Sequence, residues 1–155
     1  MNKVNGREMD KMELNEISSK IIKAAINVHK ELGPGLLESV YQKCLVIELK
    51  QIGLKVESEI PIPVDYKGQR VDDEGFRIDV LVEKRVIVEL KSVEKIKPVH
   101  PKQLLTYLRL ANKELGLLIN FNVVLLKAGI SRIINAPQGL ENYSDFSSQK
   151  IRTKK

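Results

Sequence analysis

Two very apolar segments lie next to each other in the sequence, separated by the charged run Glu83-Lys84-Arg85. Residues 76–82 and 86–92 are rich in Val, Ile and Leu, so they predict a β-hairpin. Three of the charged residues in these segments need explaining: Asp79, Glu89 and Lys91. Because burying a carboxylate without a partner is costly, we expect these acids to be ion-paired, hydrogen-bonded or bound to a metal.

The length of the hairpin connection decides whether the two acids share a face of the sheet. With a three-residue connection, Val82 pairs with Val86 and Asp79 lies opposite Glu89. With a two-residue connection, Asp79 pairs with Leu90 and turns to the other face. A cluster of two acids and a lysine requires the first register, which is the one we predict.

The length of 155 residues indicates one ordinary domain. We expect a flexible N-terminal segment at 1–13, a domain at 14–135 and a basic C-terminal tail at 136–155. A single cysteine, Cys44, excludes an internal disulfide framework. No apolar run reaches the length of a membrane span, and the polar start lacks a signal-peptide core, so we expect a cytoplasmic protein without membrane contact.

The net charge of +6 invites a nucleic-acid interpretation, but its distribution weakens that interpretation. Residues 146–155 contain four basic side chains and no acidic one, whereas residues 1–13 contain three of each sign. The body of the chain is therefore only mildly basic. The tail is interpreted as a solvated end rather than a dedicated phosphate-binding arm.

The spacing of apolar residues predicts a mixed α/β domain. A strand, a helix and another strand follow one another after the hairpin, which indicates a crossover and hence a partly parallel sheet. Beside the hairpin, the expected elements are helices at 14–32, 36–51 and 98–114, and strands at 56–62, 64–66, 115–121, 123–126 and 130–134. The short acidic run at 72–74 is interpreted as a solvated turn.

The residue types in the hairpin suit metal-assisted chemistry. Asp79 and Glu89 offer hard oxygen ligands, which Mg²⁺ and Mn²⁺ prefer. A neighbouring lysine orients water or balances charge on a phosphate, so the combination points to phosphodiester hydrolysis. The alternative is a cross-strand salt bridge on a solvated face.

The order of these residues resembles the core of the PD-(D/E)XK nuclease superfamily, with Asp79 as the first acid and Glu89-Leu90-Lys91 as the E-x-K element. Ile78 stands where the family name has a proline. The resemblance implies a restriction-endonuclease-like α/β fold, with a central mixed β-sheet flanked by helices. It also implies that Asp79 and Glu89 bind Mg²⁺ or Mn²⁺, that the Leu90 carbonyl adds a ligand, and that Lys91 assists the attacking water.

A second motif lies at the start of the helix at 36–51. Residues 35–41 match the pattern G-x-x-E-x-x-Y, for which the GxxExxY proteins of this superfamily are named. The resemblance implies that Glu38 is a helix-borne acid completing the metal site, and we assign Tyr41 to substrate positioning. Alternatively, Glu38 only complements the dipole of its helix.

A third motif lies on the helix at 98–114, where Gln103 and Tyr107 are four residues apart and share a face with His100. The pair resembles the Q-x-x-x-Y element of RecB-like nucleases, which lies beside the active site and positions metal, lysine or DNA. The alternative is boundary packing of an amphipathic helix. His100 has no support as a catalytic base.

The combined motifs favour a metal-dependent nuclease, acting on DNA rather than RNA. The alternative is a catalytically silent module of the same fold that binds nucleic acid or a protein partner. A homodimer is compatible with both functions.

Overall fold

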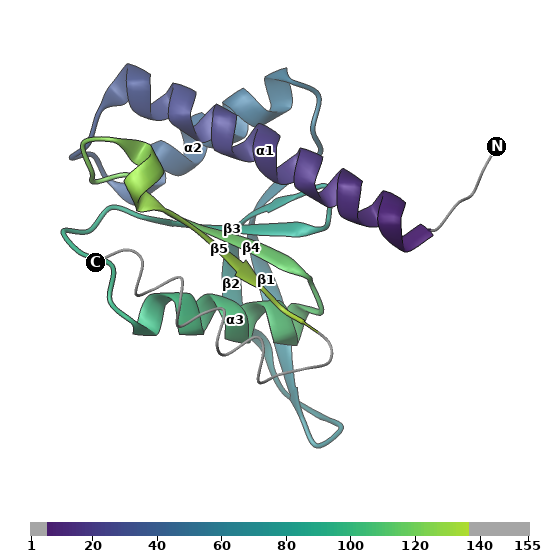
Figure 1. Cartoon of the computed structure of the whole chain (residues 1–155). Coiled ribbons are helices and arrows are strands. Elements are labelled where there is room, and N and C mark those ends of the chain that lie inside the picture. The colour runs from purple at the N-terminus through teal and green to yellow at the C-terminus, as the bar shows by residue number, and fades with distance from the viewer. Residues whose placement is uncertain (1–5, 137–155) are drawn as a thin grey trace.

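The computed structural model describes the backbone of residues 6–136 and the side chains of residues 13–136. One five-stranded mixed sheet has the strand order β1-β2-β3-β4-β5 and carries helices on both faces (Figure 1). This α/β architecture confirms the predicted fold class. The elements are α1 (Gly6–Leu32), α2 (Glu38–Gln51), β1 (Val56–Tyr66), β2 (Gln69–Val82), β3 (Val86–Lys91), α3 (Val99–Ala111), β4 (Leu115–Asn120), the 3₁₀ helix η1 (Leu126–Gly129) and β5 (Ile130–Ile134).

Helices α1 and α2 cover one face of the sheet and α3 covers the other (Figure 1). In β3, Val86, Val88 and Leu90 pack in the core under α1 and α2, whereas Ile87 packs in the core under α3. Because side chains alternate along a strand, Glu89 and Lys91 fall on the α3 face. The two charged residues of β3 therefore share a face, as predicted.

Helix α3 connects two parallel strands. β3 and β4 pair in parallel, with Lys91 opposite Asn120 at their carboxyl ends, and β4 pairs antiparallel with β5. The crossover predicted from the strand, helix and strand pattern is thus confirmed. A charged residue, Lys91, and a polar residue, Asn120, are therefore neighbours where these two strands end.

The hairpin register is also the predicted one. Val82 pairs with Val86 across a three-residue connection, in which Glu83 and Lys84 have φ values of 53° and 56°. Pairing of β2 with β3 stops at Val80 and Val88. Asp79 and Glu89 therefore lie one step beyond the last paired residues, where the two strands separate.

The strands separate because the β1–β2 ribbon turns over at this point. Val56 and Val80 belong to the core under α1 and α2, but Ile60 and Ile78 belong to the core under α3. These residues would share one face in a regular ribbon. Glu59 lies between them in β1, with a left-handed φ of 53°. The reversal carries Asp79 out of the regular β2–β3 ladder.

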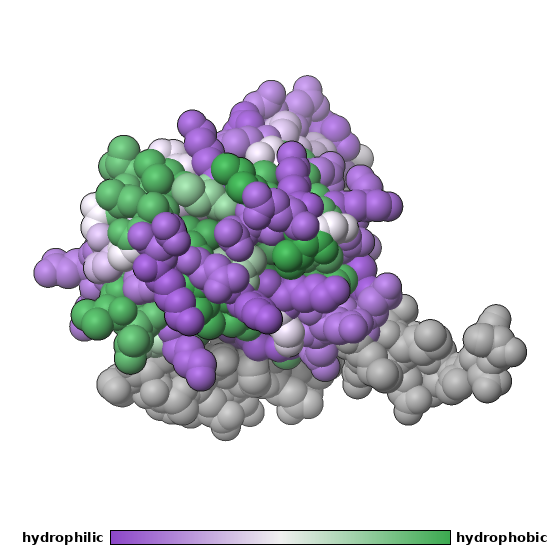
Figure 2. All heavy atoms as spheres, turned by 90° about the horizontal axis from the view of Figure 1, so that it is seen from above, coloured by the Kyte–Doolittle hydropathy of each residue, from purple (hydrophilic) through white to green (hydrophobic). Residues whose placement is uncertain are grey.

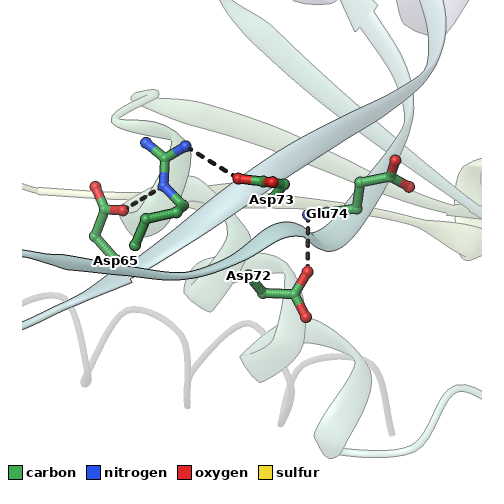
Figure 3. A network of polar contacts seen from close by, with 5 residues as sticks. Asp65, Asp72, Asp73 and Glu74 are labelled. Carbon is green, nitrogen blue, oxygen red and sulfur yellow. Dashed lines mark hydrogen bonds and ion pairs between the residues drawn. The ribbon is translucent and has the colours of Figure 1, made fainter.

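Beyond the reversal, the ribbon projects past α3 (Figure 1). The acidic residues 72–74 belong to β2 and not to a turn, so that prediction was wrong, although all three are exposed as expected. The pairing shifts register beside them, at Val64. Arg70 forms a cross-strand ion pair with Asp65 of β1 and a second ion pair with Asp73 of its own strand (Figure 3).

Three other element predictions need correction. Helix α1 begins at Gly6 rather than at residue 14, and α2 begins at Glu38 rather than at residue 36. No strand forms at 123–126; the 3₁₀ helix η1 follows, and β5 pairs with β4 instead. Gly129 permits this tight path, because a Cβ there would lie 2.3 Å from the Asn120 carbonyl oxygen. The predicted basic tail lies outside the described residues from position 137 onward.

Tyr41 is a core residue. Its side chain is fully buried, and its ring stacks on Phe121 with 4.4 Å between the ring centroids. The hydroxyl donates to the Gly33 carbonyl oxygen and accepts from the Leu36 N–H. A substrate cannot reach this side chain, so the assignment of Tyr41 to substrate positioning was wrong. Tyr41 instead holds the loop that leads into α2.

Replacing Tyr41 with Phe is expected to lower the free energy of unfolding by about 1–2 kcal/mol, because two backbone groups lose a buried hydrogen-bond partner. Urea unfolding measures this change. Tyr66→Phe is the matched control, because Tyr66 is 63 % exposed and its hydroxyl remains in water. Equal stability of the two variants would contradict the loop-holding role.

Candidate active site

Asp79 and Glu89 form the centre of the site. The Leu90 N–H donates to Asp79 Oδ2 over 2.9 Å, which fixes the Asp79 carboxylate against β3 directly beside Glu89. The other Asp79 oxygen remains available to a ligand. In a strand, the N–H and C=O of one residue point to the same side, so the Leu90 carbonyl also faces the gap left by β2. Three oxygen-bearing groups thus converge where the hairpin opens.

Glu89 is buried at a cost. Its side chain is 8 % exposed, and among the described residues no group forms a hydrogen bond with its Oε1 atom. Burial, and after it the carboxylate of Asp79, raise the pKa of Glu89, whereas Lys91 lowers it; the net result is a pKa of about 8. A buried carboxylate with an unpartnered oxygen is a position where a cation or a proton is needed.

The pKa of Asp79 is shifted in the same direction. Burial raises it most, and the carboxylates of Glu38 and Glu59 add to the increase. The Leu90 N–H and Lys91 lower it, but the net shift is upward. Burial, reinforced by the nearby acids, thus makes both carboxylates harder to ionise than carboxylates in water.

The donor set fits a hard divalent cation. Two carboxylates and a backbone carbonyl are the oxygen ligands that Mg²⁺ and Mn²⁺ accept. Within the described part of the chain, however, no three His, Cys, Asp or Glu side chains form a group that can hold a metal ion. Glu38 therefore does not complete a three-acid cage with Asp79 and Glu89.

Glu38 nevertheless lies within electrostatic reach of the site. It is the first residue of α2, and the loop before it is tied to the end of β3 because Ser92 Oγ donates to the Leu36 carbonyl oxygen over 2.6 Å. Its carboxylate raises the pKa of both Asp79 and Glu89, after larger contributions from burial. The position also complements the helix dipole, as the alternative interpretation of Glu38 expects. In this structure, Glu38 acts on the site through its charge and not as a third acid grouped with Asp79 and Glu89.

Helix α3 brings Tyr107 to the site and His100 to its edge. Tyr107 stacks on Phe76 with 4.3 Å between ring centroids, and burial followed by Glu89 and Asp79 raises its pKa. His100 Nδ1 accepts the Lys97 N–H over 3.1 Å, and burial followed by Lys91 and Lys97 lowers its pKa. Gln103 is exposed on the same helix, one turn before Tyr107.

Asn120 is a structural residue that the sequence interpretation missed. Its side chain is 3 % exposed and bonds both backbone groups of Val93, each over 3.0 Å. The Phe121 N–H also donates to the Lys91 carbonyl oxygen over 2.9 Å. The chain that leaves β3 after Lys91 is thus fixed to the end of β4. A polar residue ending the apolar segment 115–119 was the available signal.

Exposed aliphatic side chains surround the loops at the end of the molecule that carries η1. Figure 2 shows hydrophobic residues gathered at this end, whereas hydrophilic side chains cover most of the rest of that face. Leu37 is 73 % exposed, Val124 is 86 % exposed and Leu125 is 72 % exposed. His29 braces the underlying loop, because its Nε2 atom lies 2.8 Å from the Val123 carbonyl oxygen.

A mixed sheet with two helices on one face and one on the other, and with acids and a lysine where the hairpin opens, defines a restriction-endonuclease-like α/β domain. Residues 15–133 match the family described as the PD-(D/E)XK nuclease superfamily, and the chain belongs to this superfamily. Its members are generally nucleases. No curated protein matches the chain. Among the helices of the described region, none has the length and apolarity needed to cross a membrane.

Proposed function

We propose that this protein is a metal-dependent nuclease of the GxxExxY branch, which hydrolyses phosphodiester bonds in DNA rather than in RNA. The observation that carries the proposal is Glu89: a carboxylate only 8 % exposed, with an unpartnered oxygen, beside Asp79 and Lys91. Such an arrangement destabilises the empty site and favours a bound cation.

Asp79, Glu89 and the Leu90 carbonyl are the groups that would hold Mg²⁺ or Mn²⁺, with Glu38 contributing negative charge from α2. When bound, the cation polarises the phosphoryl oxygen and makes water more acidic. Hydrolysis adds the oxygen of water to phosphorus and breaks one phosphorus–oxygen ester bond. The leaving oxygen takes up a proton.

Lys91 is the catalytic residue that supplies a positive charge in this proposal. It follows Glu89 by two residues and shares its face of the sheet, so its ammonium group can orient the attacking water and offset charge on the phosphate. Asn120 supports the chain directly after it. Tyr107 and Gln103 on α3 are proposed to position the substrate.

Incubation of the purified protein with single-stranded DNA, duplex DNA, branched DNA and RNA tests this function. We expect cleavage of at least one DNA substrate with Mg²⁺ or Mn²⁺, and no cleavage with a chelator. Cleavage of RNA alone would contradict the proposed substrate. Cleavage that persists in the chelator would contradict metal dependence.

Asp79→Asn is expected to abolish the rise in melting temperature that Mg²⁺ or Mn²⁺ produces in the wild-type protein, because a ligand specific for the folded state stabilises it. A thermal-shift titration measures this effect without a substrate. Asp73→Asn is a matched control, since Asp73 is exposed on the distant part of the ribbon and should respond as wild type does. Equal responses of the two variants would refute Asp79 as a ligand.

A second candidate is a silent module of the same fold that binds a protein partner. The exposed side chains Leu37, Val124 and Leu125 favour it, because exposed apolar groups gathered at one end of a molecule are typical of interaction surfaces. Absence of both cleavage and metal-induced stabilisation would favour this candidate over the nuclease.

A further inference from the structure

We propose that Glu59 is a further acidic residue of the site, one that strengthens cation binding through its charge and through water molecules bound to the cation. This inference rests on the proposed function and extends its metal site to β1. Nothing in the motif at 79–91 or in the motif at 35–41 includes this residue.

The backbone of Glu59 is strained. Its φ of 53° is left-handed, a conformation that is unfavourable for a residue with a Cβ. Among the non-glycine residues with positive φ in the described part of the chain, only Glu59 lies inside a strand. The other non-glycine residues with positive φ lie at turns or at a helix end: Lys67, Glu83, Lys84 and Asn112. A residue held in such a conformation within a strand suggests a functional constraint.

The strand pairing places Glu59 across from Asp79. The neighbouring pairs are Ser58 with Val80 and Ile60 with Ile78, so Glu59 and Asp79 occupy the facing positions between them. Both residues lie where the ribbon turns over. The reversal that removes Asp79 from the ladder thus also brings a second acid of the ribbon to the same position.

Contacts from two directions fix Glu59. Arg77 Nη1 donates to its carbonyl oxygen over 3.1 Å, and Gln42 Nε2 donates to its carboxylate oxygen Oε2 over 2.8 Å. Gln42 lies one helical turn after Glu38 on α2. The Glu59 carboxylate is therefore held at α2, one helical turn from Glu38, through its Oε2 atom.

The charge of Glu59 acts on the centre of the site. Its carboxylate lies within electrostatic reach of both Asp79 and Glu89. The unpartnered Oε1 of the buried Glu89 independently marks the place for a cation. Mg²⁺ binds one or two carboxylates directly and retains several waters, so a further carboxylate can act through those waters. Such a role does not require a three-acid cage.

Two variants of Glu59 separate charge from backbone strain. Glu59→Gln removes the charge and keeps the size, the strain and an oxygen for Gln42. It is expected to weaken the apparent affinity for Mg²⁺ and Mn²⁺ about fivefold in thermal-shift titrations, through the lost Coulomb attraction. Glu59→Gly removes both charge and strain. Its melting temperature without metal is expected to stay within about 3 °C of wild type, because relief of strain offsets the greater freedom of the unfolded chain.

The results distinguish this inference from the proposed function. If Asp79→Asn loses the cation response while Glu59→Gln retains wild-type affinity, the role of Glu59 is refuted and the metal site stands. If the wild-type protein shows no cation response, both proposals fail. If Glu59→Gln and Glu59→Gly weaken affinity equally while the glycine variant remains folded, the charge of Glu59 is established as the cause.

Discussion

Replacing Lys91 with Ala is expected to lower the rate of DNA cleavage by about 100-fold or more, because a positioned charge and proton donor is removed from the reacting water and phosphate. The fold should persist, since Lys91 lies at the end of β3 and its side chain is partly exposed. Cation-induced stabilisation should also persist, because the proposed ligands are unchanged. Cleavage assays and thermal-shift titrations of the same preparation measure both properties.

Lys50→Ala is the matched control for Lys91→Ala. It removes the same charge at the opposite end of α2 from Glu38, so its cleavage rate should equal that of wild type. A loss of catalysis in Lys91→Ala should appear in kcat rather than in KM, because the proposed role concerns the chemical step. Unchanged cleavage by Lys91→Ala would overturn the assigned catalytic residue.

The charged residues of the hairpin were predictable because they break local rules. Asp79, Glu89 and Lys91 lie in segments rich in Val, Ile and Leu, and the period of two along β3 suffices to place Glu89 and Lys91 on one face. The register followed from the length of the charged connection, and the pairing of Val82 with Val86 confirms it. These predictions depended only on the local sequence pattern and on the geometry of a hairpin.

Features that depend on long-range packing were not predictable from the same patterns. Glu59 becomes a site residue only through its pairing opposite Asp79 and through the reversal of the ribbon, and the sequence around Glu59 contains no glycine that would signal a left-handed backbone. Tyr41 was misassigned for a similar reason. A tyrosine three residues after an acid suggests a shared surface, but stacking on Phe121 buries it.

Glu89→Gln is expected to change how stability depends on pH in the absence of metal. The folded protein holds a proton on Glu89 up to about pH 8, whereas the unfolded chain releases it near 4.5. Between these values the folded state binds more protons, so this residue lowers the stability of the wild-type protein as pH rises through the window. Because Gln cannot ionise, the stability of the variant does not fall with pH for this reason.

The variant should therefore gain stability relative to wild type between pH 5 and pH 8.5, by about 2–4 kcal/mol once solvent relaxation and coupling to Asp79 are allowed for. Urea unfolding in a chelator at several pH values measures the difference. Glu114→Gln removes an exposed carboxylate and should follow the wild-type curve. Parallel curves for wild type and Glu89→Gln would contradict the buried, proton-bound state of Glu89.

The same proton links pH to cation binding. A divalent cation competes with the proton for the Glu89 carboxylate, so cation-induced stabilisation of the wild-type protein should increase as pH rises toward and past about 8. Glu89→Gln should show no such increase, because it has lost the competing group and a charged ligand. If the cation-induced stabilisation of the wild-type protein did not change with pH, Glu89 would not be a ligand of the cation. The nuclease assignment would then lose the observation on which it chiefly rests.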